Sequence, residues 1–218
     1  MTSSQKSKEY IFIESFVLSC INDARDDIRK KKKPLSKSSN NIKNKGTGAG
    51  GSNTNKNGLP YEELTDLDDK LSILNESQYS SKIKFNGSEK SFIKTGQSKL
   101  FKCMKDDINQ NITKAHGCKN PDECYIDKES RNIFIIEKKF QQTSGSVCEK
   151  IQTSDFKKWQ YKRTFPDFNI VYIYCLSEWF KENCIAELEY LKYKGVPVFW
   201  GSSITYKDDM VNFIINYK

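Results

Sequence analysis

The run from Phe168 to Leu176 (FNIVYIYCL) limits the fold of this chain more than any other segment. It is rich in β-branched and aromatic residues, and no polar residue alternates with the apolar ones after Asn169. A strand of this kind is buried on both faces, so helices must cover both sides of its sheet. Val196–Trp200 predicts a second short buried strand. We therefore expect an α/β (α+β) fold in which helices flank a mixed sheet.

Further periodic segments complete this expectation. The strands Cys124–Ile126 and Ile133–Glu137, joined by a polar turn at residues 128–131, predict a β-hairpin. A capping-box sequence, Ser146 to Glu149, predicts the start of a helix. Helical spacing of apolar residues predicts helices over residues 64–74, 97–114, 147 to before Pro166, 179–193 and 208–217.

The charge of +8 lies in one tract of the 218-residue chain. Nine Lys or Arg and no acid occur from Arg29 to Gly58, which leaves 27 basic and 28 acidic residues elsewhere. We expect a helical segment at residues 1–29, with amphipathic spacing from Tyr10 to Ile28. Residues 30–58 predict a flexible Lys/Asn/Gly/Ser-rich linker or loop. Residues 59–218 have the composition of a globular domain.

Several classes of protein are excluded by what the sequence lacks. No apolar run of eighteen residues is present, so we expect no membrane association, and the polar start predicts a cytoplasmic protein. Seven cysteines without a C-x-x-C pair predict reduced thiols instead of disulfides. Gly46-x-Gly48-x-x-Gly51 lacks the strand and helix that a dinucleotide site needs. The three tryptophans are expected in the core.

A candidate site follows from the hairpin register. If the turn occupies residues 128–131, Asp127 pairs with Asn132, and paired residue numbers keep the sum 259. Asp122 and Glu137 then lie opposite each other on one face, with Cβ atoms about 5 Å apart. Such a pair of like charges needs a cation between its members.

Lys139 supplies a positive charge, because it lies two residues beyond Glu137 and points to the same face, whereas Lys138 points to the other. Two carboxylates and an ammonium suit metal-assisted hydrolysis with Mg²⁺. Asp127 is a rival carboxylate, but it lies at the turn end of the hairpin. Asp122 is therefore the expected partner of Glu137.

The sequence Pro121-Asp122, fourteen intervening residues, then Glu137-x-Lys139 resembles the signature of the PD-(D/E)xK nuclease superfamily, which includes many type II restriction endonucleases. The following EKKFQQTSGSVCEKIQT resembles a subgroup of restriction enzymes, and the likeness covers residues 85–200. It implies a restriction-endonuclease-like core with a catalytic β-hairpin. The core strand before Asp122 is expected within Ser81–Phe92.

The resemblance also implies a chemistry. Asp122, Glu137 and the backbone carbonyl of Lys138 would bind Mg²⁺, and Lys139 would act on the attacking water. The expected function is that of a Mg²⁺-dependent type II restriction endonuclease. Such an enzyme would cut double-stranded DNA at a specific short sequence and leave 5′-phosphate and 3′-hydroxyl ends.

The expected enzyme is a homodimer, because a single site cuts one strand. The alternatives are a repair or junction-resolving nuclease on the same core, and a non-catalytic nucleic-acid-binding module with a structural ion cluster.

Further candidates surround this cluster. A local excess of positive charge from residue 137 to residue 163 suits phosphate binding, although a solvated helix face has the same pattern. Glu149 is either a helix cap or a ligand, and Glu89 or Glu63 is a possible extra acid. The candidate DNA-binding residues are Gln141, Ser146, Lys150, Lys157, Lys158 and Lys162.

Overall fold

The computed structural model describes residues 60–143 and 147–218, and its compact unit comprises Tyr61–Lys218. The predicted segments at residues 1–29 and 30–58 lie outside the described residues. Residues 60–64 are helical. The further elements are η1 (Asp68–Lys70), β1 (Leu71–Glu76), β2 (Ser81–Phe85), β3 (Ser91–Thr95), η2 (Gln97–Lys99), α3 (Leu100–Lys102), η3 (Cys103–Asp107), β4 (Glu123–Asp127), β5 (Asn132–Lys139), α4 (Val147–Gln152), α5 (Ser154–Thr164), β6 (Asn169–Leu176), α6 (Trp179–Asn183), α7 (Ile185–Tyr193), β7 (Val198–Trp200) and α8 (Tyr206–Asn216).

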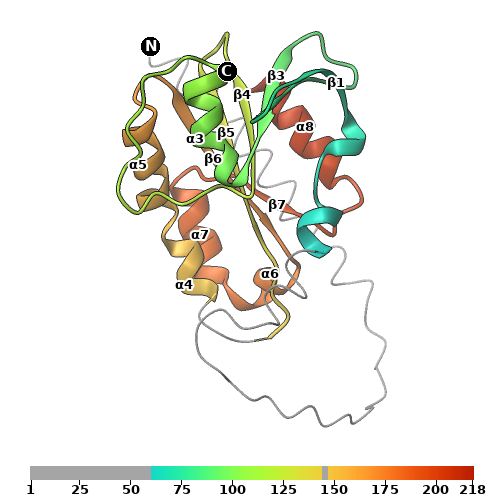
Figure 1. Ribbon diagram of the computed structural model, residues 1–218. Helices are drawn as coiled ribbons and strands as arrows, with labels where there is room; N and C mark the ends of the chain where they lie inside the picture. Colours follow the sequence, from blue (N-terminus) through green and yellow to red (C-terminus); the bar gives the residue numbers. More distant parts are fainter. Residues whose placement is uncertain (1–59, 144–146) are drawn as a thin grey trace, which may run out of the picture. The chain divides into compact units, whose positions relative to one another are not determined.

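The strands form one mixed sheet of seven, in the order of the chain from β1 to β7. Strands β1 to β5 are antiparallel neighbours, whereas β6 runs parallel to β5 and β7 parallel to β6. A parallel connection needs a crossover, and α4 with α5 provides the first, while α6 with α7 provides the second. Helices α3, α4, α5 and α7 lie on one side of the sheet and α8 on the other (Figure 1). The expectation of a mixed sheet flanked by helices is confirmed.

Strand β5 shows how the two faces are divided. Ile133 and Ile135 belong to the main hydrophobic cluster, to which α3, α4 and α5 also contribute. Phe134 and Ile136 point to the opposite face, and the Phe134 ring packs against Tyr217, just after α8. Strand β6 is buried throughout except at its first residue, which confirms that it is covered on both faces.

Two predicted helices near the start of the domain are wrong in extent. Residues 71–76 form strand β1 instead of helix, because backbone pairing with β2 prevails over the leucine spacing, and Leu74 is half exposed. The helix predicted over 97–114 ends at Asp107, and Asn109 adopts a left-handed φ of 57° that stops it.

Two other predicted helices are each divided into two. The first breaks at Thr153, whose side-chain hydroxyl donates to the Lys150 carbonyl at 2.8 Å and competes with helical bonding. The second breaks at Cys184. None of the helices in residues 60–143 and 147–218 has the length and apolar character that crossing a membrane requires.

Candidate active site

The hairpin β4–β5 has the register that the position of its turn predicts. Asp127 pairs with Asn132, and the other four pairs also add up to 259. Asp122 directly precedes β4 and continues this register opposite Glu137. Its Oδ2 accepts a hydrogen bond from the backbone N–H of Lys138 at 2.7 Å. That bond holds the Asp122 carboxylate against the end of β5.

Three oxygen atoms at this end of the hairpin converge on one ammonium group. Lys139 Nζ lies 2.9 Å from Glu137 Oε1 and 3.5 Å from Asp122 Oδ2. It also donates to the backbone carbonyl of Lys138 at 2.9 Å. The sequence-predicted residues are therefore brought together, and the ammonium separates the two carboxylates as expected.

The charges of the cluster shift its ionisation. Burial disfavours the ionised form of Glu137, but the ammoniums of Lys139 and Lys157 outweigh it and hold its pKa below the usual value. Asp122 shows the opposite balance: burial raises its pKa, and Lys139 offsets this only in part. Burial disfavours the Lys139 ammonium, yet the two carboxylates together raise its pKa. At neutral pH Lys139 is therefore a cation.

The donor set suits a hard divalent cation. Two carboxylates and a carbonyl are the oxygen ligands that Mg²⁺ prefers, and all three face the point that Lys139 approaches. Asp122, Glu137 and the Lys138 carbonyl would hold the ion, and Lys139 would have to share or give up its contacts with them.

Comparisons with known proteins do not indicate a family or a function for this cluster. No family model matches the chain, and neither a curated protein nor a solved structure does. What the cluster can do chemically therefore follows from its own residues and distances.

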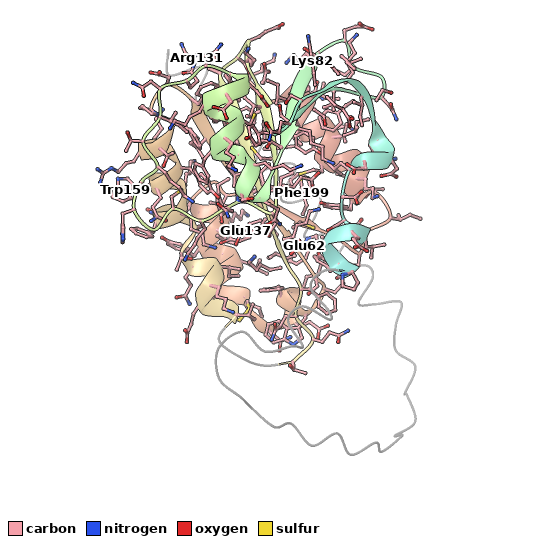
Figure 2. All side chains as sticks on the ribbon, in the orientation of Figure 1. Glu62, Lys82, Arg131, Glu137, Trp159 and Phe199 are labelled. Carbon is pink, nitrogen blue, oxygen red and sulfur yellow. A yellow bond between two sulfur atoms is a disulfide. The ribbon has the colours of Figure 1, made fainter. Side chains whose placement is uncertain are left out.

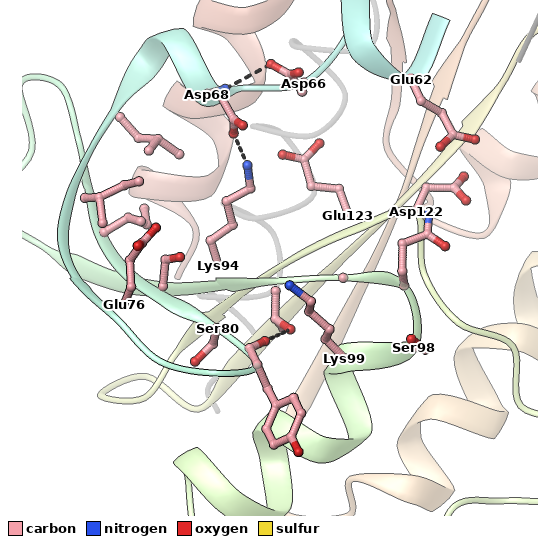
Figure 3. A pocket seen from close by; sticks show the side chains of 18 of the residues that line it. Glu62, Asp66, Asp68, Glu76, Ser80, Lys94, Ser98, Lys99, Asp122 and Glu123 are labelled. Atoms are coloured by element: carbon pink, nitrogen blue, oxygen red, sulfur yellow. Dashed lines mark hydrogen bonds and ion pairs between the residues drawn. The ribbon is translucent and has the colours of Figure 1, made fainter. Parts of the chain in front are cut away.

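Sequence reasoning missed two neighbours of the cluster. Lys157, predicted only as a DNA-binding residue, pairs with Glu137 Oε1 at 3.0 Å. Glu62 approaches Asp122 from the short helix at residues 60–64 (Figure 3), and its pKa is raised by burial and by that carboxylate. From sequence alone the adjacent Glu63 is a possible extra acid, but in the structure Glu63 is exposed. Nothing in the local pattern distinguishes the two, because the distinction depends on how that helix packs.

The other face of β5 carries a separate buried ion pair. Lys138 Nζ lies 2.8 Å from Glu123 Oε2, and both side chains are nearly inaccessible. Lys138 also donates to the Glu62 carbonyl at 3.0 Å, and the Tyr125 hydroxyl donates to Glu123 Oε1. The prediction that Lys138 points away from the site is confirmed. The backbone carbonyl of Lys138 accepts a hydrogen bond from Lys139, whereas its side chain pairs with Glu123 on the other face of the sheet.

The remaining candidate acids lie elsewhere. Asp127 accepts hydrogen bonds from the turn, including one from the Ser130 hydroxyl at 2.6 Å. Glu149 is exposed in the first turn of α4, and Glu89 pairs with Lys84 at the surface. Within the described residues, no hydrogen bond or ion pair joins any of these carboxylates to the cluster.

The choice of Gln141 as a DNA-binding candidate assumes that side chains continue to alternate beyond Lys139 and that Gln141 points to the face of the cluster. Strand β5 ends at Lys139, so the alternation of side chains does not continue to Gln141. Its amide donates instead to the Thr143 carbonyl at 2.6 Å within the same loop.

The predicted DNA-binding lysines divide into two groups. Lys162 donates to the carbonyls of Pro166 and Phe168, so its ammonium is engaged beyond the end of its own helix. Lys150 on α4 is exposed and Lys158 on α5 is half-buried, so both reach solvent. Ser146 lies outside the described residues.

A cavity of about 1050 Å³ adjoins the cluster over strands β1 to β4 (Figure 3). Its charged lining is dominated by acids, and one of its lysines, Lys94, pairs with Asp68. The acidic lining residues are Glu62, Glu63, Asp66, Asp68, Glu76, Asp122 and Glu123, and the basic ones are Lys94, Lys99 and Lys138.

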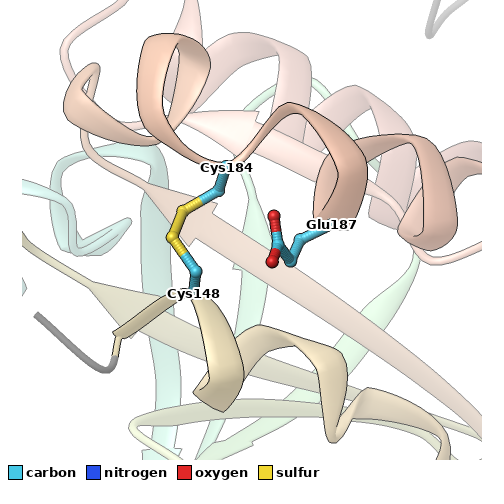
Figure 4. Close-up of side chains that lie close together, drawn as sticks. All are labelled: Cys148, Cys184 and Glu187. Atoms are coloured by element: carbon cyan, nitrogen blue, oxygen red, sulfur yellow. A yellow bond between two sulfur atoms is a disulfide. The ribbon is translucent and has the colours of Figure 1, made fainter.

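The expectation that all cysteines are reduced is wrong. Cys148 and Cys184 form a disulfide, with Cα atoms 5.7 Å apart (Figure 4). The packing of α4 beside the junction of α6 and α7 brings them together across 36 positions of sequence, a spacing that carries no signal by itself. Glu187 lies within 4.8 Å of both sulfurs. Because both sulfurs are joined in the disulfide, neither is a thiolate that could bind a metal, and this group differs from the oxygen set at β5.

Proposed function

We propose that residues 59–218 form a Mg²⁺-dependent DNA endonuclease of the PD-(D/E)xK type, acting as a type II restriction endonuclease on double-stranded DNA. The observation that best supports this proposal is that Asp122, Glu137 and the Lys138 carbonyl all contact the ammonium of Lys139. The element order around the hairpin supports the proposal. Strand β3 precedes the Asp122 strand, helices follow the Glu137 strand, and a parallel strand then joins the sheet.

Each residue has a defined task in this proposal. Asp122, Glu137 and the Lys138 carbonyl would hold the cation, and a bound cation would supply polarisation of the scissile phosphate and stabilisation of its developing charge. Lys139, cationic among the carboxylates, donates to the attacking water or to a phosphate oxygen and so orients the reactants. Lys157 fixes the side chain of Glu137 from the neighbouring helix. The products carry 5′-phosphate and 3′-hydroxyl ends.

Cutting both strands of a duplex needs two such sites. We therefore propose a homodimer whose two-fold axis matches that of a palindromic target. Its subunits would each act on one strand at a specific short sequence.

Cleavage of a long sequenced duplex with and without Mg²⁺ tests the proposal. We expect discrete fragments from the wild-type protein, and at least about a 100-fold lower rate from Glu137→Gln and from Lys139→Met. Glu149→Gln and Lys105→Met change exposed residues of the same charge and serve as matched controls that retain activity.

The other outcomes separate the alternatives. An uncut duplex together with cleavage of branched or damaged DNA would support a repair or junction-resolving nuclease instead. Binding without cleavage of either substrate would support a non-catalytic nucleic-acid-binding module. Cleavage that survives both substitutions would contradict the assignment of these residues.

A further inference from the structure

Two large aromatic rings and a guanidinium are stacked on the outer surface of α5. The rings of Phe156 and Trp159 lie 5.6 Å apart at an angle of 26°, and Arg163 Cζ lies 5.0 Å from the centre of the Trp159 ring. Phe156 is 59% exposed and Trp159 is 49% exposed. Trp159 was expected in the core, but Figure 2 shows it at the periphery of the molecule. Two exposed, stacked rings with a cation over one of them form a ready contact surface.

The spacing along α5 places this surface beside the candidate site. Phe156, Trp159 and Arg163 are three and four residues apart, so they form one stripe along the helix. Lys157, next to Phe156, points about a quarter turn away and pairs with Glu137 at 3.0 Å. A helix with its side chains is only about 10–12 Å wide. The stripe therefore lies within a short reach of the carboxylates.

The charges on this helix favour a polyanion. Helix α5 contains four cations and one acid, Asp155, and that acid is paired with Lys194 at 2.8 Å. In the part of the chain that the structure describes, neither Lys158 nor Arg163 has an ion-pair partner. Among the charged residues that line the cavity beyond Asp122, acids outnumber bases and repel phosphate. A nucleic-acid strand at the site is therefore drawn toward α5.

Stacked rings flanked by cations have a specific complement in nucleic acids. Bases in a duplex already stack on one another, whereas an unpaired base exposes its π-face to an aromatic side chain. We propose that Phe156, Trp159 and Arg163 form a stacking platform for a nucleotide that is unpaired where the bound DNA passes α5, a contact that a fully paired duplex does not make. This inference deepens the proposed function and rests on it for the course of the strand.

Binding without catalysis tests the platform. The full chain in EDTA is titrated at fixed salt into labelled oligo-dT of about 16 nucleotides, and separately into a duplex of equal length, with fluorescence anisotropy as the readout. Trp159→Ala is expected to weaken oligo-dT binding by about 5- to 100-fold and duplex binding by less than about twofold. Trp159→Phe retains a ring and is expected to recover much of the loss. Ile204→Ser, at a fully exposed apolar residue, is the matched surface control.

Several results would overturn the platform. Unchanged oligo-dT binding by Trp159→Ala would do so, as would an equal loss for oligo-dT and duplex. A lower unfolding midpoint in Trp159→Ala, or its conversion from dimer to monomer, would assign the rings to folding or to an interface between copies. Because no cleavage is measured, an inactive but binding-competent protein would contradict the proposed nuclease and leave the platform standing.

Discussion

Lys157 Nζ on α5 lies 3.0 Å from Glu137 Oε1, the same oxygen that Lys139 Nζ reaches at 2.9 Å. One carboxylate oxygen thus receives two ammonium groups, one from its own strand and one from the helix packed on the sheet. Both ammoniums stabilise the ionised carboxylate, and both repel a divalent cation that approaches it. A divalent cation that binds at Glu137 must therefore compete with two ammonium groups.

Removing the helix cation is expected to tighten metal binding. Lys157→Gln should lower the Mg²⁺ dissociation constant by about 3- to 10-fold, equivalent to about 1 kcal/mol, because one repulsive charge beside Glu137 is lost. Isothermal titration with Mg²⁺ measures this directly. Lys150→Gln, at an exposed residue of α4, should leave the constant unchanged. Unchanged or weaker binding by the Lys157 variant would contradict the electrostatic role.

Neutralising Asp122 and neutralising Glu137 should change the free energy of unfolding of the metal-free protein in opposite directions. Burial, only partly offset by Lys139, raises the pKa of Asp122, so this group's contribution to stability is present at low pH and lost as pH rises through the folded pKa. The pKa of Glu137 is lowered, so its contribution is present above the unfolded pKa and lost as pH falls. At neutral pH we expect Asp122→Asn to raise the free energy of unfolding and Glu137→Gln to lower it, each by roughly 1 kcal/mol.

Urea unfolding in EDTA at neutral pH and near pH 4 checks this pair. The loss of stability in Glu137→Gln should shrink toward acid pH, because the unfolded wild-type carboxylate then begins to bind a proton and the ionised group contributes less to folding. Addition of Mg²⁺ should stabilise the wild type more than either variant. If both variants shift the free energy of unfolding in the same direction at neutral pH, the two carboxylates do not have opposite effects on stability.

Gly96 is expected to set the position of Asp122. A Cβ at Gly96 would lie 3.0 Å from the backbone oxygen of Asp122, and the neighbouring Gln97 N–H donates to Pro121 O at 2.8 Å. Gly96→Val should therefore destabilise the fold by about 1–3 kcal/mol and weaken Mg²⁺ binding. Gly87→Ala is the control, because it strains a backbone with φ of 78° but meets no neighbouring atom. Equal Mg²⁺ affinity in both variants would show that Gly96 acts on stability alone.

The disulfide is expected to stabilise the domain. In the chain-entropy account, closing a loop of 36 positions contributes about 3–4 kcal/mol, so the double variant Cys148→Ser, Cys184→Ser should unfold at lower urea. Peptide mapping after alkylation of the unfolded, unreduced chain should find both cysteines unmodified. Their alkylation before reduction would exclude the bond.

The hairpin was predictable because its determinants are local. A polar turn and alternating side chains establish which residues face each other, so Asp122, Glu137 and Lys139 follow from counting along two strands. The contributions of Glu62 and Lys157 were not predictable. Each comes from a helix whose placement depends on packing across the whole sheet.

Other errors have the same physical origin. The spacing of Leu71 and Leu74 fits a helix, but pairing with β2 decides the local structure. Trp159 is apolar but half exposed, because α5 presents this side chain to solvent and not to the core. Cys148 and Cys184 meet only after α4 and α7 have packed.

The hairpin turn also bears on how spacing in the Asp122–Glu137 motif should be interpreted. Since strand pairing is counted from the turn, the number of intervening residues measures the length of the two arms and not a requirement of the chemistry. Asp127 closes the turn roughly 17 Å from the carboxylates. Extra residues inserted between Lys128 and Arg131 would enlarge the spacing and leave the two carboxylates in place. The turn is thus a natural attachment point for a reporter peptide, and a strict spacing rule would overlook equivalent sites on longer hairpins.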